Sequence, residues 1–344
     1  MKKLGVFLLV IMCLFLTACG KKEEKKEEVK TEEKPVEVKE EKKEETYKYS
    51  RPYGVVINNY PSAVKVQSGL DKAFAIYEFP IEGGLSRSLA FFRDVDEDKL
   101  GTIRSARHNY IDYIHEYDAI FVHFGGSAEA YSELKGSNKV DHIDGNTTDK
   151  TPFGREKYEN LATEHTVYTN LSKIIDYIKN VKKFRTGTNE VGPIKYSKEE
   201  VNLKEKEESK VANTVDVYYS NSFYVTYKYN KTTKRYDRYF KGNPHKDYFT
   251  KKQYDCKNVI IEFMTWGTVS GHKDAAGNSY LNLNNTGKGE GYYITNGYAV
   301  PITWEKDTRS SKTIYKYKDG KEIDVNDGNT WVMITSKSKK YNIK

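Results

Sequence analysis

The sequence predicts an α+β fold, in which a mixed α/β domain over residues 47–203 precedes a mostly antiparallel β domain over 211–344. In the first half, strand-length apolar runs are mixed with helical periods and a glycine turn, which is typical of an α/β layer. In the second half, apolar and polar residues alternate between turn dipeptides. A charged run over 204–210, Lys-Glu-Lys-Glu-Glu-Ser-Lys, marks the expected boundary between the two.

The first expected elements are strands. Residues 51–61 read Arg-Pro-Tyr-Gly-Val-Val-Ile-Asn-Asn-Tyr-Pro, which indicates a short buried strand that Asn and Pro end. Residues 75–92 contain two apolar runs on either side of Gly83 and Gly84. We therefore expect a pair of strands joined by a turn at these glycines.

Helices and further strands are expected after this pair. Apolar side chains recur at helical spacing after Ser105, and Ser127 stands at the N-cap position of a second helical pattern. The order of elements is then a helix opening at Ser105, a strand over 118–124, a helix over 128–134, a strand over 166–168 and a helix over 171–184.

The second half shows the period of two that strands require. Val215, Val217 and Tyr219 alternate with polar residues, and a similar alternation follows at 223–229. Hairpin signals then recur along the chain at Gly242-Asn243-Pro244, Gly277-Asn278, Asp319-Gly320 and Asp327-Gly328.

The N-terminus has the features of an export signal. Met1-Lys2-Lys3 is a positive n-region, and the apolar segment over 4–16 is too short to span a membrane. Leu16-Thr17-Ala18-Cys19 resembles the lipobox of bacterial lipoproteins. We therefore predict a signal peptide over residues 1–19, lipidation of Cys19 and a location at the extracellular face of the cell membrane.

Residues 20–46 are expected to be a disordered tether. Lys and Glu make up most of this segment, which cannot bury enough apolar surface to fold. The whole chain carries a formal net charge of +8. On an exported protein this charge favours contact with anionic wall polymers, and we expect no nucleic-acid partner.

Few residues could support cysteine or metal chemistry. Once Cys13 leaves with the signal and Cys19 carries lipid, Cys256 is left without a disulfide partner. The seven His show no paired metal spacing, so no metal site or cofactor is expected.

Charges inside the apolar segment 75–92 are the strongest local signal for a site. Glu78, Glu82 and Arg87 lie there, although a buried charge costs several kcal/mol unless it is paired. These residues therefore require partners or a function.

Several motifs follow one another from about Arg51 to the C-terminus. The N-terminal motifs are Gln67-Ser68-Gly69-Leu70, Tyr77-Glu78-Phe79-Pro80-Ile81-Glu82-Gly83-Gly84, Ile103-Arg104-Ser105-Ala106-Arg107 and Val122-His123-Phe124-Gly125-Gly126-Ser127. The C-terminal ones are Tyr236-Asp237-Arg238, Asn258-Val259, Gly287-Lys288-Gly289 and Asp327-Gly328-Asn329-Thr330-Trp331. Together these motifs resemble the YerB-like lipoproteins of Gram-positive bacteria.

The resemblance implies cleavage of peptidoglycan glycan strands, as in a lytic transglycosylase. One motif departs from the family pattern, because this chain has Glu164-His165-Thr166 where Pro-His-Asn is usual.

Glu82 is the candidate for proton transfer in such a reaction. A lytic transglycosylase needs one carboxyl group that protonates the glycosidic oxygen and then accepts a proton. Glu82 stands at a Gly-Gly turn, where missing side chains let a sugar approach the backbone. The structural alternative is that Glu82 caps the turn or pairs with Arg87.

Glu78 is the second catalytic candidate. It lies four residues before Glu82, nominally on the same strand face, so repulsion between the two carboxylates could raise one pKa. The alternative is an ion pair with Arg87 or Arg104. A hydrolase would need another carboxylate, for which Asp112 is a distant candidate.

A cluster of basic and small residues is the predicted substrate-binding region. Arginine matches carboxylates bidentately, and glycine turns at strand ends commonly bind ligands. There are two structural alternatives. The arginines could pair with Glu78 and Glu82, and the histidine could have a purely structural role. The predicted binding residues are Arg87, Arg104, Ser105, Arg107, His123, Gly125, Gly126 and Ser127.

Two classes of function remain open from the sequence. The first is an enzyme that cleaves glycan strands, and the second is a non-catalytic envelope module that holds a glycan or a wall-synthesis or wall-remodelling protein. The variant Glu82→Gln separates them, because it should abolish catalysis but leave most of a binding function.

Overall fold

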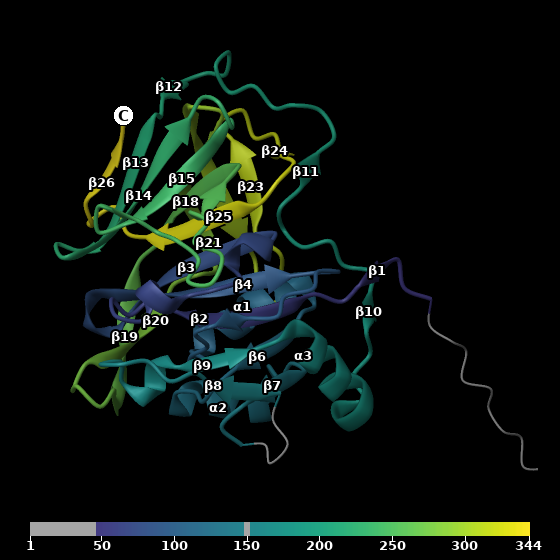
Figure 1. Cartoon of the computed structure of the whole chain (residues 1–344). Coiled ribbons are helices and arrows are strands. Elements are labelled where there is room, and N and C mark those ends of the chain that lie inside the picture. Colours follow the sequence, from purple (N-terminus) through teal and green to yellow (C-terminus); the bar gives the residue numbers. More distant parts are fainter. Residues whose placement is uncertain (1–45, 148–151) are drawn as a thin grey trace, which may run out of the picture. The chain divides into compact units, whose positions relative to one another are not determined.

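The computed structural model describes residues 46–147 and 152–344, and the described chain from Thr46 forms one compact unit. The predicted signal peptide, the lipidation site Cys19 and nearly all of the tether lie outside these residues. Strands outweigh helices throughout, so the predicted α+β class is confirmed (Figure 1).

A large mixed sheet is the centre of the fold. Among the described residues it has 11 strands, in the order β12-β22-β21-β18-β25-β3-β4-β2-β6-β7, with β23 beside β22. The strands are β2 (Tyr53–Asn58), β3 (Ala75–Ile81), β4 (Leu85–Phe92), β6 (Ile120–His123), β7 (His142–Asp144), β12 (Lys210–Val211), β18 (Asn258–Phe263), β21 (Gly287–Thr295), β22 (Tyr298–Lys306), β23 (Ile314–Tyr317) and β25 (Thr330–Thr335).

This sheet combines strands from both sides of the expected boundary at 204–210. β25 pairs in parallel with β3, with Thr330 opposite Ala75 and Met333 opposite Glu78. β25 also pairs in parallel with β18, although most other pairs of the second half are antiparallel. Figure 1 shows β25 beside β3 at this junction.

A second sheet packs against the large one. Its order is β16-β15-β14-β13-β26, with β17 beside β15. Its strands are β13 (Thr214–Ser220), β14 (Phe223–Asn230), β15 (Arg235–Phe240), β16 (Asn243–Pro244), β17 (Asp255–Cys256) and β26 (Tyr341–Ile343).

Alternation along the central strands places apolar side chains on both faces of the large sheet. In β3, Ile76 belongs to the core that contains the second sheet, whereas Tyr77 and Phe79 belong to the core beneath α1 (His108–Tyr117). A strand buried on both faces reads as a near-continuous apolar run, as β3 does apart from Glu78, whereas the apolar run of β4 extends only from Leu89 to Phe92. The site-bearing turn between these strands therefore stands on a rigid base.

Smaller elements complete the described fold. The helices after α1 are α2 (Ala128–Lys135) and α3 (Leu171–Tyr177), and α3 continues as a π-helical turn (Ile178–Lys182). Short 3₁₀ turns are Val64–Val66, Leu70–Lys72, Glu82–Gly84 and Thr163–His165. The remaining strands form β1 (Tyr49–Ser50) with β10 (Gly187–Thr188), β11 (Tyr196–Ser197) with β24 (Val325–Asn326), β19 (Trp266–Lys273) with β20 (Ser279–Leu283), and β5 (Leu100–Gly101) and β8 (Phe153–Arg155) with β9 (Val167–Thr169).

Two helix boundaries differ from the prediction. Ser127 caps α2 as expected, since its Oγ accepts a hydrogen bond from the amide of Ala130 at 3.2 Å. Ser105 does not cap α1, which begins at His108 after extended backbone at Arg107. The amide of Ala106 instead donates to the Gly125 carbonyl, so this segment is tied to the glycine turn. The helix expected over 171–184 loses its α-helical hydrogen bonds after Tyr177.

Candidate functional site

A polar cleft of ≈ 610 Å³ opens beside the turn between β3 and β4. Its walls come from six segments that are distant in the sequence. They are the segment 58–62 after β2, the β3–β4 turn with Glu82 and Arg87, the segment 104–107, Gly126, the loop at 160–165 and the tip of the β19–β20 hairpin with Asp274 and Tyr280. The structure thus brings together Glu82, Arg87, Arg104, Ser105, Arg107 and Gly126 from the predicted set.

The Gly83-Gly84 turn places Glu82 in this cleft. Gly83 and Gly84 have φ values of 73° and 69°, a left-handed conformation that glycine adopts at little cost. A Cβ at Gly84 would lie 3.1 Å from the Cβ of Ser220, which leaves little room for a side chain. The turn ends the strand period after Ile81, so Glu82 lines the cleft while Glu78 does not.

Glu82 forms an ion pair with Arg107. The Nε of Arg107 donates to Oε2 of Glu82 at 3.2 Å, and Nη2 of Arg107 donates to Oε1. The guanidinium also lies over the ring of Tyr280, 4.8 Å from its centroid. Burial raises the pKa of Glu82, but the hydrogen bond and charge of Arg107, with the charge of Arg87, outweigh burial and lower it. Glu82 is therefore ionised at neutral pH.

Arg87 lines the same cleft without a carboxylate partner. Its Nη1 donates to the Ser105 carbonyl at 2.6 Å, whereas its buried Nε has no partner among the residues that the structure describes. No described carboxylate lies within ion-pair distance of it. Burial, and then the charge of Arg107, lower the pKa of Arg87 to about 9. The cleft therefore contains a buried cation that forms no direct ion pair with the carboxylates in the described part of the chain.

The outer wall of the cleft carries a further arginine and a histidine. Arg104 lies 3.6 Å from the exposed carboxylate of Glu164. His165 is stacked on Tyr60 at 4.6 Å, and its Nδ1 accepts a hydrogen bond from Nδ2 of Asn58 at 2.9 Å. Burial and the charge of Arg104 lower the pKa of His165, so its ring is neutral. Its proton is assigned to Nε2, because Nδ1 accepts.

Glu78 is not brought to the cleft. Its side chain is fully buried, accepts from Ser86 Oγ at 2.6 Å, and forms an ion pair with Arg238 at 2.7 Å. The sequence predicted a pairing role as the alternative for Glu78, but the partner is Arg238 instead of Arg87 or Arg104. A substrate in the cleft does not reach this carboxylate.

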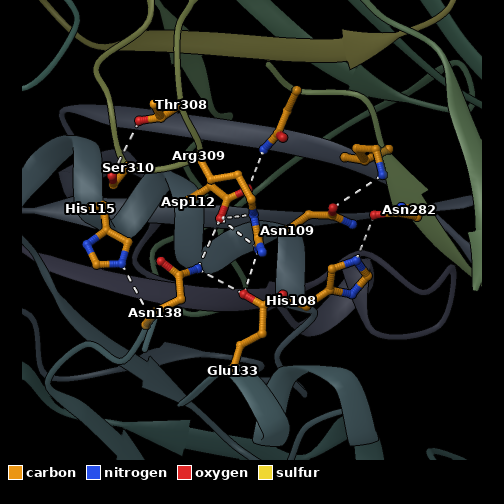
Figure 2. Close-up of polar contacts among 12 residues, drawn as sticks. His108, Asn109, Asp112, His115, Glu133, Asn138, Asn282, Thr308, Arg309 and Ser310 are labelled. Atoms are coloured by element: carbon orange, nitrogen blue, oxygen red, sulfur yellow. Dashed lines mark hydrogen bonds and ion pairs between the residues drawn. The ribbon is translucent and has the colours of Figure 1, made fainter. Parts of the chain in front are cut away.

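Asp112, the distant second carboxylate, also faces away from the cleft. Both of its oxygens accept from Nε of Arg309 at 3.0 Å, and Asn285 donates to it at 2.8 Å. Figure 2 shows this group with Glu133 and Asn138 beside the pair. Asp112 therefore joins α1 to a C-terminal loop.

The predicted binding residues around the glycine turn separate into two groups. His123 is buried, and its Nδ1 donates to the Gly125 carbonyl at 2.8 Å, so it does not line the cleft. Burial lowers the pKa of His123 to about 4. Gly126 lines the cleft, while Gly125 lines only a side cavity of ≈ 310 Å³ that shares Arg104 and Ser105 with it. Ser127 is occupied as the cap of α2.

Other chemistries find no support among residues 46–147 and 152–344. No group of three or more His, Cys, Asp or Glu could hold a metal ion there. Burial raises the pKa of the Cys256 thiol, which makes it a poor nucleophile. No helix in the described part of the chain is long and apolar enough to span a membrane.

Sequence reasoning missed several residues of the cleft wall. No local pattern connects the missed residues, because more than two hundred positions separate the first from the last; they are Asn58, Tyr60, His165, Asp274 and Tyr280. One signal was present, since the loop at 164–166 is where this chain departs from the family pattern. Tyr280 follows the Gly277-Asn278 turn, whose position over Glu82 depends on tertiary packing.

We expect the Glu82–Arg107 pair to contribute to stability in a pH-dependent way. A carboxyl whose folded pKa is lowered stabilises the fold above its unfolded value near 4.5, and this contribution is lost as the pH falls through the folded pKa. Glu82→Gln should therefore lower the free energy of unfolding by roughly 1.5–3 kcal/mol at pH 7. The difference from wild type should shrink below about pH 4.5.

Urea unfolding at several pH values measures this difference. The control Glu290→Gln removes an exposed carboxylate paired with Lys337 and should cost no more than about 0.5 kcal/mol. A Glu82→Gln difference that is equal at pH 7 and pH 3 would contradict the lowered pKa.

Comparisons with known proteins place this architecture in a family. The profile described as "Protein of unknown function (DUF3048) N-terminal domain" matches residues 38–185, and the corresponding C-terminal domain matches 215–332. The chain is 28% identical to "Putative lipoprotein YerB" of Bacillus subtilis (strain 168) over 339 residues, which cover 97% of this chain and 96% of that protein.

A solved structure supports the same relationship. The crystal structure of the YerB protein from Bacillus subtilis matches with a TM-score of 0.72 and 27% sequence identity. The match covers 86% of this chain and 94% of that one. The chain therefore belongs to the YerB-like family, and it matches both the N-terminal and the C-terminal DUF3048 domain models.

Proposed function

We propose that this protein is an exported lipoprotein, anchored through Cys19, that binds and cleaves glycan strands of peptidoglycan in the cleft at Glu82. The lipobox-like sequence before Cys19 and the name of the Bacillus subtilis relative support the anchoring. The net charge of +8 suits contact with anionic wall polymers.

The observation that carries the proposal is the buried guanidinium of Arg87, which forms no ion pair with any described carboxylate although Glu82 lies in the same cleft. A buried cation without a counter-ion is costly, and a ligand carboxylate would remove that cost while forming bidentate hydrogen bonds. Peptide stems of peptidoglycan carry carboxylates, as does the lactyl group of a strand whose stem has been removed. Arg87 would hold such a group, and Tyr60, Tyr280 and His165 would contact sugar rings.

Cleavage would use Glu82 in both proton transfers. Its carboxyl group donates a proton to the glycosidic oxygen as the bond from C1 breaks. The C6 hydroxyl of the same muramic residue then attacks C1 and returns its proton to Glu82. The products are a 1,6-anhydro end and a free hydroxyl, and the carboxyl group is regenerated.

The ion pair with Arg107 sets a condition on this mechanism. Glu82 is ionised in the free protein, so an acid role requires that a ligand carboxylate takes over Arg107 and releases Glu82. The adjacent Arg87 makes such an exchange possible within the same cleft. Cleavage should accordingly become faster as the pH falls from 8 toward 5, as more of Glu82 is protonated.

A digest of purified peptidoglycan with the full chain, analysed by mass spectrometry, tests the proposal. We expect anhydro-muramic products from wild type and from the control Glu290→Gln, but none from Glu82→Gln. Reducing-end products would instead indicate a hydrolase, which needs a second carboxylate in the cleft.

The second candidate is a binding module without catalysis. The observation that favours it is the Glu82–Arg107 ion pair, which keeps the carboxylate charged. In that case the digest releases nothing, and wild type and Glu82→Gln sediment with peptidoglycan to a similar extent. Failure of both proteins to sediment would contradict each form of the proposal.

A further inference from the structure

A second groove of ≈ 620 Å³ lies next to the cleft, on the other side of the segment Tyr60–Lys65. Ser62 lines both spaces. Phe240 and Pro244 form an apolar part of its wall. Three exposed lysines also line the groove, namely Lys65, Lys241 and Lys246.

Positive charge in this groove is not compensated. No Asp or Glu is among the residues that line it. Lys65, Lys241 and Lys246 form no ion pair with any residue in the described ranges, whereas many other lysines of the chain do. Lysines gathered in a concave surface without carboxylates attract anions.

A buried donor supports the same conclusion independently. Nε of Arg238 donates to Nδ1 of His245 at 3.0 Å, so the hydrogen of the His245 ring is assigned to Nε2. His245 lines the groove and is 3% exposed, and its Nε2 has no partner within the described part of the chain. An unsatisfied buried donor is destabilising until an acceptor reaches it.

Buried hydrogen bonds connect the two spaces. Ser86, which lines the cleft, donates to Glu78, and Glu78 accepts from Arg238, which donates to His245 in the groove. The floor of the cleft and the floor of the groove are therefore one rigid network.

We infer that the groove is a second binding segment for the same anionic glycan strand, whose carboxylates are held there by Lys65, Lys241, Lys246 and His245. This inference rests on the proposed function, since the strand enters the groove from the cleft across Ser62. It adds that one strand occupies both spaces, because Ser62 lines the cleft and the groove and an extended ligand can cross from one to the other there.

Strand length tests the inference. The probes are a disaccharide tetrapeptide and soluble uncrosslinked glycan strands with the same stems, and both are measured by calorimetry at low salt in the full chain carrying Glu82→Gln. The triple variant Lys65→Ala/Lys241→Ala/Lys246→Ala should bind the strands roughly 10-fold more weakly. Its affinity for the disaccharide tetrapeptide should change less than about two-fold. A third probe, poly(glycerol phosphate), is measured in the same way.

Control variants distinguish the loss of net charge from the loss of lysines at the groove itself. The triple variant Lys135→Ala/Lys179→Ala/Lys231→Ala removes the same charge from exposed positions outside the groove and should bind strands as the parent does. Arg87→Ala should lower the affinity of the protein for both glycan probes.

Three results would overturn the inference. If the groove variant loses no strand affinity while Arg87→Ala does, the groove is not a binding segment, although the proposed function stands. If the groove variant loses affinity for poly(glycerol phosphate) but not for the glycan strands, the groove takes a phosphate polymer and not the glycan. If the parent binds neither glycan probe, the proposed function fails together with the inference.

Discussion

Replacing Arg238 by methionine is expected to lower the free energy of unfolding by about 3–5 kcal/mol. The substitution leaves the fully buried carboxylate of Glu78 without its counter-ion, and a buried uncompensated charge is strongly destabilising. It also removes the stacking of the guanidinium on Trp331, whose ring centroid lies 4.0 Å away. Urea unfolding followed by far-UV circular dichroism measures the loss.

A double variant identifies the cause. Arg238→Met combined with Glu78→Gln should recover part of the loss, because the uncompensated charge is then absent. Lys337→Met, which breaks an exposed pair with Glu290, should change stability by no more than about 1 kcal/mol. If the double variant is as unstable as the sum of both single variants, packing and not charge explains the effect.

The Glu78–Arg238 pair illustrates what the sequence could predict. A charged residue in the continuous apolar run of β3 indicated that a partner exists, and the two strands around Gly83-Gly84 followed from local patterns. The partner could not be deduced, because 160 residues separate Glu78 from Arg238. Local periodicity has no information on which strand of the second sheet packs opposite β3.

The same physical limit applies to the candidate site. The predicted arginine cluster does meet at the cleft, because Arg104, Ser105 and Arg107 share one segment that the Gly125 carbonyl fixes. Ser105 as an N-cap was wrong, since this bond keeps the segment extended until α1 begins at His108. His123 was a reasonable candidate at a strand end, but the depth of its burial depends on strand β7.

Parallel pairing of β25 with β3 was also outside what the pattern predicts. The alternation after residue 211 indicates strands and turns, and most of these pairs are antiparallel as expected. It does not indicate that β25 enters the large sheet next to β3. Pairing over such a separation is determined by the complete packing of both cores.

Arg87→Met is expected to weaken ligand binding strongly while it leaves stability almost unchanged. Arg238→Met, in contrast, is expected to act mainly on stability. Both arginines are buried, but Arg87 has no carboxylate partner within the described chain. Its replacement loses one hydrogen bond to the Ser105 carbonyl, worth about 1 kcal/mol, and removes a buried charge that opposes folding. The free energy of unfolding should therefore stay within about 1 kcal/mol of wild type.

Ligand binding should respond differently. If Arg87 holds a carboxylate of the glycan strand, Arg87→Met should weaken binding about 30-fold or more, because the anion then enters the cleft unpaired. Arg87→Lys should keep only part of the wild-type affinity, since a lysine cannot form the bidentate hydrogen bonds of an arginine. Calorimetry with the disaccharide tetrapeptide and urea unfolding of the same variants give both quantities. A variant that is strongly destabilised and still binds would assign Arg87 to the fold and leave the cleft without its anion-binding residue, whereas stability near wild type with lost binding is the pattern of a charge kept for a ligand.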